Sequence, residues 1–362
     1  MDSPMDNIII ELRPRLSSVN FFINLRKGTD PQSYKINLFS RKFDFVSESQ
    51  VFSVKCPSDY LFLENSLSCL TYGSNYIYFR CNLDTIDKKL GSCNGEFLKS
   101  LSSSVSKKSV IKLLPESQYK IQCVNCQQNF NDCIKFERIL PLPSNHIDPS
   151  EWFCHKHENE NKTLTCLNPK LGDLFYSSCY FHIHQDNLKN VVVKSKNIVC
   201  KRCLLWLGLN TENYVKSWFH NIQFVSGNKA EYSTPTKDVF LTISDIVEQN
   251  FLGCAKILFE QCSPKGNDYL FVWILEKNLK IFFGNALTDL EEHSVYKVLY
   301  QFENDAETVN RWMNDNGVFC VTVSKQMMVD ALKNLNKYHK LLPESFSKSN
   351  GLYISYLLIP DD

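Results

Sequence analysis

The pattern of apolar and polar positions changes along this 362-residue chain. From residue 7 to about residue 83, short apolar or alternating runs are separated by Pro, Asn, Ser, Asp and Gly. Such runs are typical of strands in half-exposed antiparallel sheets. They read "IIIEL", "VNFFINL", "YKINLF", "YLFLE", "LSCLTY" and "YIYFRC". We therefore expect the first part of the chain to be rich in β-structure.

In the last third, helical spacing appears beside further strands. The stretch "PTKDVFLTISDIVEQNFLG" has apolar residues at helical spacing, with Thr236 as the expected N-cap and Gly253 as the stop. Two more helices are expected in "DAETVNRWMNDNG" and "SKQMMVDALKNLNKYHKLL", and strands in "AKILFEQ", "YLFVWIL", "LKIFFG", "SVYKVLYQF" and "GLYISYLLI". Because strands and helices do not alternate as βαβ units, we predict an α+β fold, predominantly β, with mostly antiparallel sheets.

Composition suggests four parts. We expect a β-rich N-terminal domain at 1–97, a Ser/Lys-rich linker at 98–114, a Cys/His-rich middle domain at 115–230 and a C-terminal α+β domain at 231–362. Within the middle domain, three prolines keep "ILPLPSNHIDPSEW" extended rather than helical. Strands are expected to resume at "DLFYSSCYFHIH" and "YVKSWFHNIQFV".

The net charge and the N-terminal sequence limit the cellular locations and the classes of partner that we expect. Lys plus Arg (40) nearly balance Asp plus Glu (39), so no overall field favours nucleic acid or an anionic membrane. The N-terminus is acidic where a signal peptide would be basic, and the longest strongly apolar run, 269–275, is too short to span a membrane. We expect a cytoplasmic protein, with a nuclear pool as an open alternative. Its 15 cysteines are then expected to be thiols or metal ligands.

The clearest candidate site is a pair of Cys-x-x-Cys knuckles, formed by Cys123 with Cys126 and by Cys200 with Cys203. Two thiolates from one tight turn bind one side of a tetrahedral zinc ion, and two such turns complete a closed structural site. Sharing one ion requires that residues 127–199 form an inserted subdomain. Two unrelated thiol turns, or redox-active cysteines, are the alternatives. A thioredoxin-like role is not expected, since neither knuckle opens a helix after a buried parallel strand.

Further potential ligands follow in "PSEWFCHKHENEN" and "FHIH". Cys154 and His155 either join the knuckle zinc or form a second site with His157, His182 or His184. The simpler expectation for the last two is a strand carrying surface or core histidines. Cys166 and Cys179 are expected to pack as small apolar residues.

An ordinary metabolic enzyme is not indicated. A thiolate beside an imidazole is a good nucleophile, but adjacent residues in an extended chain, such as Cys154 and His155, point apart. No Gly-x-Ser-x-Gly, Walker, His-Glu-x-x-His or dinucleotide motif occurs in the sequence.

Several blocks resemble one known family. They are the first knuckle, "ILPLPS" followed by "EWFCH", "IVCKRCLLWLG", "YKVLYQ" and "LLPESFSKSNGLYISYL". In order and spacing, from about residue 118 to the end, they are similar to HECT-like ubiquitin-protein ligases described as binding ubiquitin-conjugating enzymes. The resemblance implies ubiquitin transfer through a C-terminal cysteine. It also implies binding to the metallo-β-lactamase endonuclease of pre-mRNA 3′-end cleavage, which relatives restrain or protect.

The ligase role needs a catalytic cysteine that the chain does not show. HECT domains carry a Thr-Cys nucleophile, but the comparable "VTVSKQMMVDAL" has no cysteine, and the last cysteine is Cys320. Alternation in "GVFCVTV" predicts that Cys320 is a buried core thiol with a raised pKa, a poor acceptor of ubiquitin. If transfer occurs, Cys320 is the expected acceptor, and Cys154 is a weaker candidate.

The residues agree better with the second role that the resemblance implies, that of a binding module. Glu151, Trp152, Phe153, Cys154 and His155 would form a loop inserted into the endonuclease. Cys154 and His155 would ligate its zinc at the position kept open for water, and the aromatic pair would anchor the interface. Two function classes thus remain: an inhibitory or stabilising partner of the endonuclease, and a ubiquitin-protein ligase. A bridge between a conjugating enzyme and a substrate is compatible with both.

Overall fold

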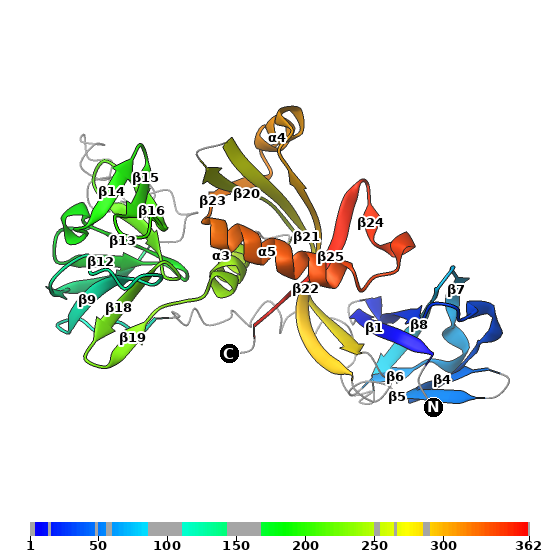
Figure 1. The fold of residues 1–362 in the computed structure, drawn as a ribbon. Coiled ribbons are helices and arrows are strands. Elements are labelled where there is room, and N and C mark those ends of the chain that lie inside the picture. Colours follow the sequence, from blue (N-terminus) through cyan, green and yellow to red (C-terminus); the bar gives the residue numbers. More distant parts are fainter. Residues whose placement is uncertain are drawn as a thin grey trace, which may run out of the picture.

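The computed structural model describes residues 4–13, 16–47, 50–55, 60–85, 111–142, 168–249, 254–263, 266–284 and 290–360. Figure 1 shows three units in a row, with the N-terminal strands at one end, the middle of the chain at the other and the C-terminal third between them. The predicted α+β class with mostly antiparallel sheets is confirmed. The proposed Cys154–His155 loop, most of the linker and Gly253 lie outside the described residues.

The N-terminal unit is built around phenylalanines from alternating strand positions. Phe21 stacks on Phe79 with ring centroids 4.4 Å apart, and Phe43 meets Phe21 edge-on at 4.9 Å. The strands β3, β4 and β5 form a separate meander, and the others join the large sheet. The strands are β1 (Met5–Arg13), β2 (Ser18–Leu25), β3 (Lys35–Phe39), β4 (Lys42–Val46), β5 (Val51–Lys55), β6 (Tyr60–Phe62), β7 (Ser68–Tyr72) and β8 (Tyr76–Thr85).

The middle unit packs two sheets around one apolar core, which includes Ile121, Phe181 and Phe224. The smaller sheet has the order β10 (Ile134–Lys135), β9 (Gln118–Cys123), β18 (Ile222–Ser226) and β19 (Lys229–Glu231). The larger sheet has the order β11 (Arg138–Pro141), β12 (Asp173–Tyr176), β13 (Tyr180–Ile183), β17 (Val215–Trp218), β16 (Trp206–Asn210), β15 (Asn197–Cys200) and β14 (Val191–Lys194). Cys179 is buried, as predicted for a small apolar residue.

The C-terminal third places helices on both faces of its sheet. Helices α3 and α5 cover the face that carries Ile257, Val272 and Val298. Helix α4 lies on the other face, where Trp312 stacks on Phe271 at 4.9 Å. The elements are α3 (Pro235–Gln249), β20 (Ala255–Ser263), β21 (Gly266–Gly284), β22 (Glu291–Glu303), α4 (Ala306–Met313), β23 (Val318–Thr322), α5 (Lys325–His339), β24 (Lys348–Ser349) and β25 (Leu352–Leu358).

Strand β21 joins the C-terminal third to the N-terminal unit. One half pairs with β20, and its far end pairs with β1, so that one sheet runs β24-β25-β22-β21-β1-β2-β8-β6. The sequence pattern predicts two separate strands here, which is wrong. The strand continues through register shifts near Glu276, where the pairing with β22 slips and the alternation is interrupted.

A buried carboxylate lies at this junction. Glu11 of β1 is fully buried and accepts hydrogen bonds from Lys297 Nζ at 2.7 Å, Tyr356 Oη at 2.7 Å and Asn20 Nδ2 at 2.9 Å. Burial alone would raise the pKa of Glu11, but the Lys297 ammonium and the three hydrogen bonds outweigh it and lower the pKa. The N-terminal strands are therefore tied to β22 by the ion pair with Lys297 and to β25 by the hydrogen bond from Tyr356.

The start of α3 corrects one sequence expectation. The helix begins at Pro235, and Thr234 caps it, since the Lys237 amide donates to Thr234 Oγ1 at 3.3 Å. Thr236 lies inside the first turn and its hydroxyl donates to Asp330 of α5 at 3.0 Å. Proline is favoured at the first helical position because it has no amide hydrogen to leave unpaired, and this explains the shift.

Candidate functional site

The two Cys-x-x-Cys knuckles converge on one point of the middle unit. Cys123 Sγ lies 3.6 Å from Cys203 Sγ, and Cys126 Sγ lies 3.6 Å from Cys200 Sγ. All four sulfur atoms lie within 4.8 Å of one another, and two of the four residues are buried. The described residues between the knuckles, which include strands β10 to β15, pair into the same two sheets and share the same core as the strands that carry the knuckles.

The two knuckles share one backbone conformation. In each, the residue after the second cysteine has a positive φ, +58° at Gln127 and +60° at Leu204. Its amide donates to the carbonyl of the first cysteine at 2.9 Å, at Cys123 and Cys200 respectively. This tight turn orients both thiols of a knuckle to the same side. Neither position is a glycine, so no residue in the turn signals this conformation in advance.

The geometry of the cluster fits a tetrahedral metal ion. A metal–sulfur distance of about 2.3 Å in tetrahedral geometry separates neighbouring sulfur atoms by about 3.8 Å, close to the distances observed. Burial raises the pKa of Cys123 and of Cys200. For Cys203, hydrogen bonds from Asn125 and from the Leu205 backbone outweigh burial and lower the pKa to about 7. Four thiolates this close need a cation among them, so the cluster has the donor set of a closed structural site.

The histidines of "FHIH" do not join the cluster. His182 lies on β13, where its ring stacks on Tyr214 at 4.4 Å, and burial together with Lys216 lowers its pKa to about 3. His184 caps a short 3-10 helix by accepting from the Asp186 amide at 3.3 Å. Both histidines therefore match the simpler expectation, surface or core histidines that do not bind a metal. Glu151, Trp152, Phe153, Cys154 and His155, with His157 and Cys166, lie outside the described residues.

The expectation that Cys320 is buried is wrong. Its side chain is exposed, because β23 pairs only with β20 among the described strands and so forms an edge of the sheet. In the register, Cys320 lies opposite Leu258, which in turn lies opposite Phe271, so the thiol is on the face that carries α4. Desolvation and the nearby Glu260 carboxylate nevertheless raise its pKa. At neutral pH the group is a thiol, which is a weak nucleophile.

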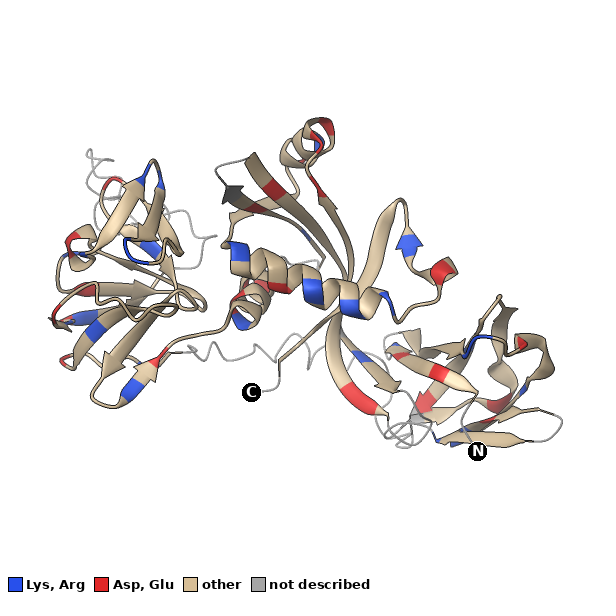
Figure 2. Cartoon of the chain, in the orientation of Figure 1, with Lys and Arg blue, Asp and Glu red and all other residues tan. Residues whose placement is uncertain are grey.

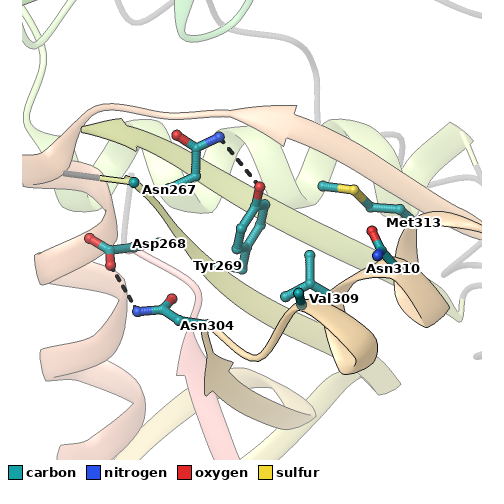
Figure 3. Close-up of a pocket in the computed structure, with 9 residues that line it drawn as sticks. Asn267, Asp268, Tyr269, Asn304, Val309, Asn310 and Met313 are labelled. Atoms are coloured by element: carbon teal, nitrogen blue, oxygen red, sulfur yellow. Dashed lines mark hydrogen bonds between the residues drawn. The ribbon is translucent and has the colours of Figure 1, made fainter. Parts of the chain in front are cut away.

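A pocket of about 570 Å³ lies on the same face, between the start of β21 and α4. Figure 3 shows the Tyr269 ring between Asn267 on one side and Val309 and Met313 of α4 on the other. The Asn267 amide donates to Tyr269 Oη at 3.3 Å, as drawn in Figure 3. The sequence did not reveal this pocket, because its residues come from two separate stretches, 266–269 and 304–313, and form no motif.

Comparison with known families decides the assignment. The family described as HECT-like ubiquitin-conjugating enzyme (E2)-binding matches residues 11–354, nearly the whole chain. The chain belongs to this family. The match extends over the N-terminal strands, where the sequence showed only loose similarity. This agrees with the pairing of β1 and β21, which makes those strands part of the same sheet as the C-terminal third.

No curated protein and no solved structure matches the chain significantly. None of the helices in the described residues has the length and apolar character needed to span a membrane.

Proposed function

We propose that this chain binds ubiquitin-conjugating enzymes and does so without taking ubiquitin onto itself as a thioester. The family match over residues 11–354 carries the first part of this proposal. The raised pKa of Cys320 supports the second. The chain would then hold a conjugating enzyme close to another protein.

The experiment uses the full-length chain and a panel of recombinant ubiquitin-conjugating enzymes, each tested free and loaded with ubiquitin. We expect at least one enzyme to bind, and non-reducing gels to show ubiquitin only on the conjugating enzyme. Failure of every enzyme to bind would refute the proposal. A ubiquitin adduct on this chain that a thiol reductant removes would refute its second part.

We also propose that the four clustered cysteines hold a structural zinc ion. Their donor set is the one that zinc prefers, and the two knuckles close around it. Cys123, Cys126, Cys200 and Cys203 would hold the ion, whose charge stabilises the thiolates. The role would be to join the two sheets of the middle unit, since Cys123 ends β9 in the smaller sheet and Cys200 ends β15 in the larger.

A second candidate function is restraint or protection of the metallo-β-lactamase endonuclease of pre-mRNA 3′-end cleavage. One observation favours it. The knuckles alone complete a four-cysteine set, so the structural site needs no ligand from Cys154 or His155. These two residues are then available to a partner's zinc. A Cys154→Ala variant should keep its own metal and stability but lose endonuclease binding; loss of the chain's own metal would rule this role out.

Ubiquitin transfer through Cys320 remains the alternative enzymatic function. The exposure of the thiol favours it, whereas the raised pKa opposes it. A reducible ubiquitin adduct that disappears in Cys320→Ala would establish transfer, and an adduct that persists in that variant would place the acceptor elsewhere.

A further inference from the structure

We infer that the pocket between α4 and the start of β21 is where the conjugating enzyme docks. The segment it receives would carry an apolar side chain flanked by lysines or arginines. This inference rests on the proposed binding of conjugating enzymes and adds the surface and the chemistry of the contact. It follows from the apolar floor, the charge around the pocket and the rigidity of its walls.

The pocket has an apolar floor that is open to a partner. Val309 is buried beneath α4, whereas Met313, one turn further on, is 40% exposed. With the Tyr269 ring these residues form an apolar floor within a volume of about 570 Å³. A flexible, polarisable methionine adapts to different apolar groups and is common at binding surfaces. The space accepts one or two side chains, as an anchor residue at an interface requires.

The surroundings of the pocket are acidic. Figure 2 shows acidic residues on α4 and on the neighbouring strands. Among the described residues of 256–269 and 303–315, which surround the pocket, there are six carboxylates and two basic side chains, a surplus of four negative charges; Lys265, next to Gly266, lies outside the described residues. The carboxylates belong to Glu260, Asp268, Glu303, Asp305, Glu307 and Asp315, and the basic groups to Lys256 and Arg311.

The surplus of four already takes both basic groups into account. Lys256 Nζ pairs with Asp315 at 2.6 Å, and Arg311, which donates to Thr308 Oγ1 at 3.3 Å, keeps its positive charge on α4. Hydrogen bonds from backbone amides lower the pKa values of Glu303 and Asp305, so both remain ionised. A complementary partner is therefore positively charged around its anchor residue.

The walls of the pocket are fixed before any partner binds. Asp305 caps α4 by accepting from the Thr308 amide at 2.9 Å, and Asn304 donates to Asp268 at 3.1 Å, which links the helix start to β21 (Figure 3). Trp312 holds the other side of α4 on the sheet by stacking on Phe271. A preformed surface loses little conformational entropy on binding, and this favours a specific contact.

The position of Cys320 links the two proposals. Tyr269 lies opposite Glu260 in the register, and Cys320 lies opposite Leu258 two residues away on the same face. An enzyme docked in the pocket would therefore lie over the face that carries this thiol. The Cys320→Ala variant shows whether the thiol contributes to docking. We expect this variant to bind the conjugating enzyme with wild-type affinity. Weakened binding would show that the thiol is part of the docking site.

The test measures affinity for the conjugating enzyme that binds wild type best, by biolayer interferometry with the full chain. We expect Met313→Lys and Glu307→Lys each to weaken binding about tenfold, because each places a positive charge against a basic partner. Val329→Lys and Glu212→Lys are matched controls: Val329 is an equally exposed apolar residue (37%) on α5, and Glu212 is an exposed acid of the middle unit. Thermal unfolding checks that all four variants fold. Wild-type binding should also weaken as NaCl is raised.

Each result is decisive. Binding by wild type with no loss in the two pocket variants overturns the docking site and leaves the proposed function intact. Equal loss in pocket and control variants also overturns the site. If the two pocket substitutions weaken the binding of free ubiquitin but not that of the conjugating enzyme, the occupant of the pocket is ubiquitin. Absence of binding by wild type to the whole panel overturns the proposed function and this inference together.

Discussion

His220 Nδ1 lies 2.6 Å from Asp238 Oδ2, and neither side chain is exposed to solvent. His220 follows β17 of the middle unit, and Asp238 lies in the first turns of α3. The other ring nitrogen, Nε2, lies 2.8 Å from Ser324 Oγ, which caps α5 by accepting from the Met327 amide. The geometry is that of a Ser-His-Asp triad, but all three groups are buried, so it joins the middle unit to both helices instead of meeting a substrate.

We predict that His220→Ala lowers the free energy of unfolding by about 3 kcal/mol, because it leaves a buried carboxylate without its partner. Ser324→Ala removes one hydrogen bond and a helix cap and should cost about 1 kcal/mol. Chemical denaturation of both variants, with a double-mutant cycle on His220 and Asp238, measures the pair. Additive effects of the two substitutions would show that they do not interact.

The cysteine cluster is tested by its metal content. Wild type should contain about one zinc ion per chain, and Cys200→Ser should lose it together with the folded middle unit, since structural zinc contributes directly to folding. Cys133→Ser is the matched control, because Cys133 is an exposed cysteine of the same unit outside the cluster. Elemental analysis measures the zinc content, and circular dichroism measures the folding of the chain. A Cys200→Ser protein that kept its metal and its stability would contradict the shared site.

The lowered pKa of His182, about 3, predicts a pH dependence of stability. The unfolded chain takes up a proton near pH 6.5 and the folded chain does not, so the stability is complete above pH 6.5 and falls as the pH drops from 6.5 toward 3. The slope from this residue reaches about 1.4 kcal/mol per pH unit. His182→Phe keeps a ring against Tyr214 and removes the titration; Nε2 has no hydrogen-bond partner to lose among the described residues.

Denaturation of wild type and His182→Phe at pH 7 and pH 5 should show a larger loss in wild type. Equal losses in the two proteins would mean that His182 is protonated in the folded chain.

The Glu11–Lys297 pair predicts that the N-terminal unit and the C-terminal third unfold together. Lys297→Met removes the cation from a fully buried carboxylate and should cost about 3 kcal/mol. Lys280→Met is the control, because the exposed pair of Lys280 and Glu292 should contribute less than about 1 kcal/mol. Fluorescence and circular dichroism should give one coincident transition in wild type. Two separate transitions would show that the shared sheet does not couple the units.

Local features of the fold followed from the sequence. The predicted C-terminal helices correspond to α4 and α5, each with an apolar period and an N-cap residue, and the last predicted strand corresponds to β25, which has an apolar run. The convergence of the four knuckle cysteines was also predicted, because thiols two residues apart have few structural roles. Zinc itself stays a prediction.

Other features of the fold could not be predicted from the local pattern of apolar and polar residues. The pairing of Ile10 with Phe282 joins residues far apart in the chain, and such a contact leaves no local periodicity. Cys320 lies in an alternating run that is typical of a half-buried strand, but an edge strand exposes positions that a central strand covers. The pocket beside Tyr269 depends on where α4 folds back over the sheet, which tertiary packing determines.

Native mass spectrometry of the full chain mixed with ubiquitin-loaded conjugating enzymes reports binding and ubiquitin transfer in one measurement. We expect a complex of the two proteins in which ubiquitin remains on the conjugating enzyme. A spectrum with no complex for any enzyme, or a reducible ubiquitin adduct on this chain that Cys320→Ala abolishes, would contradict this expectation.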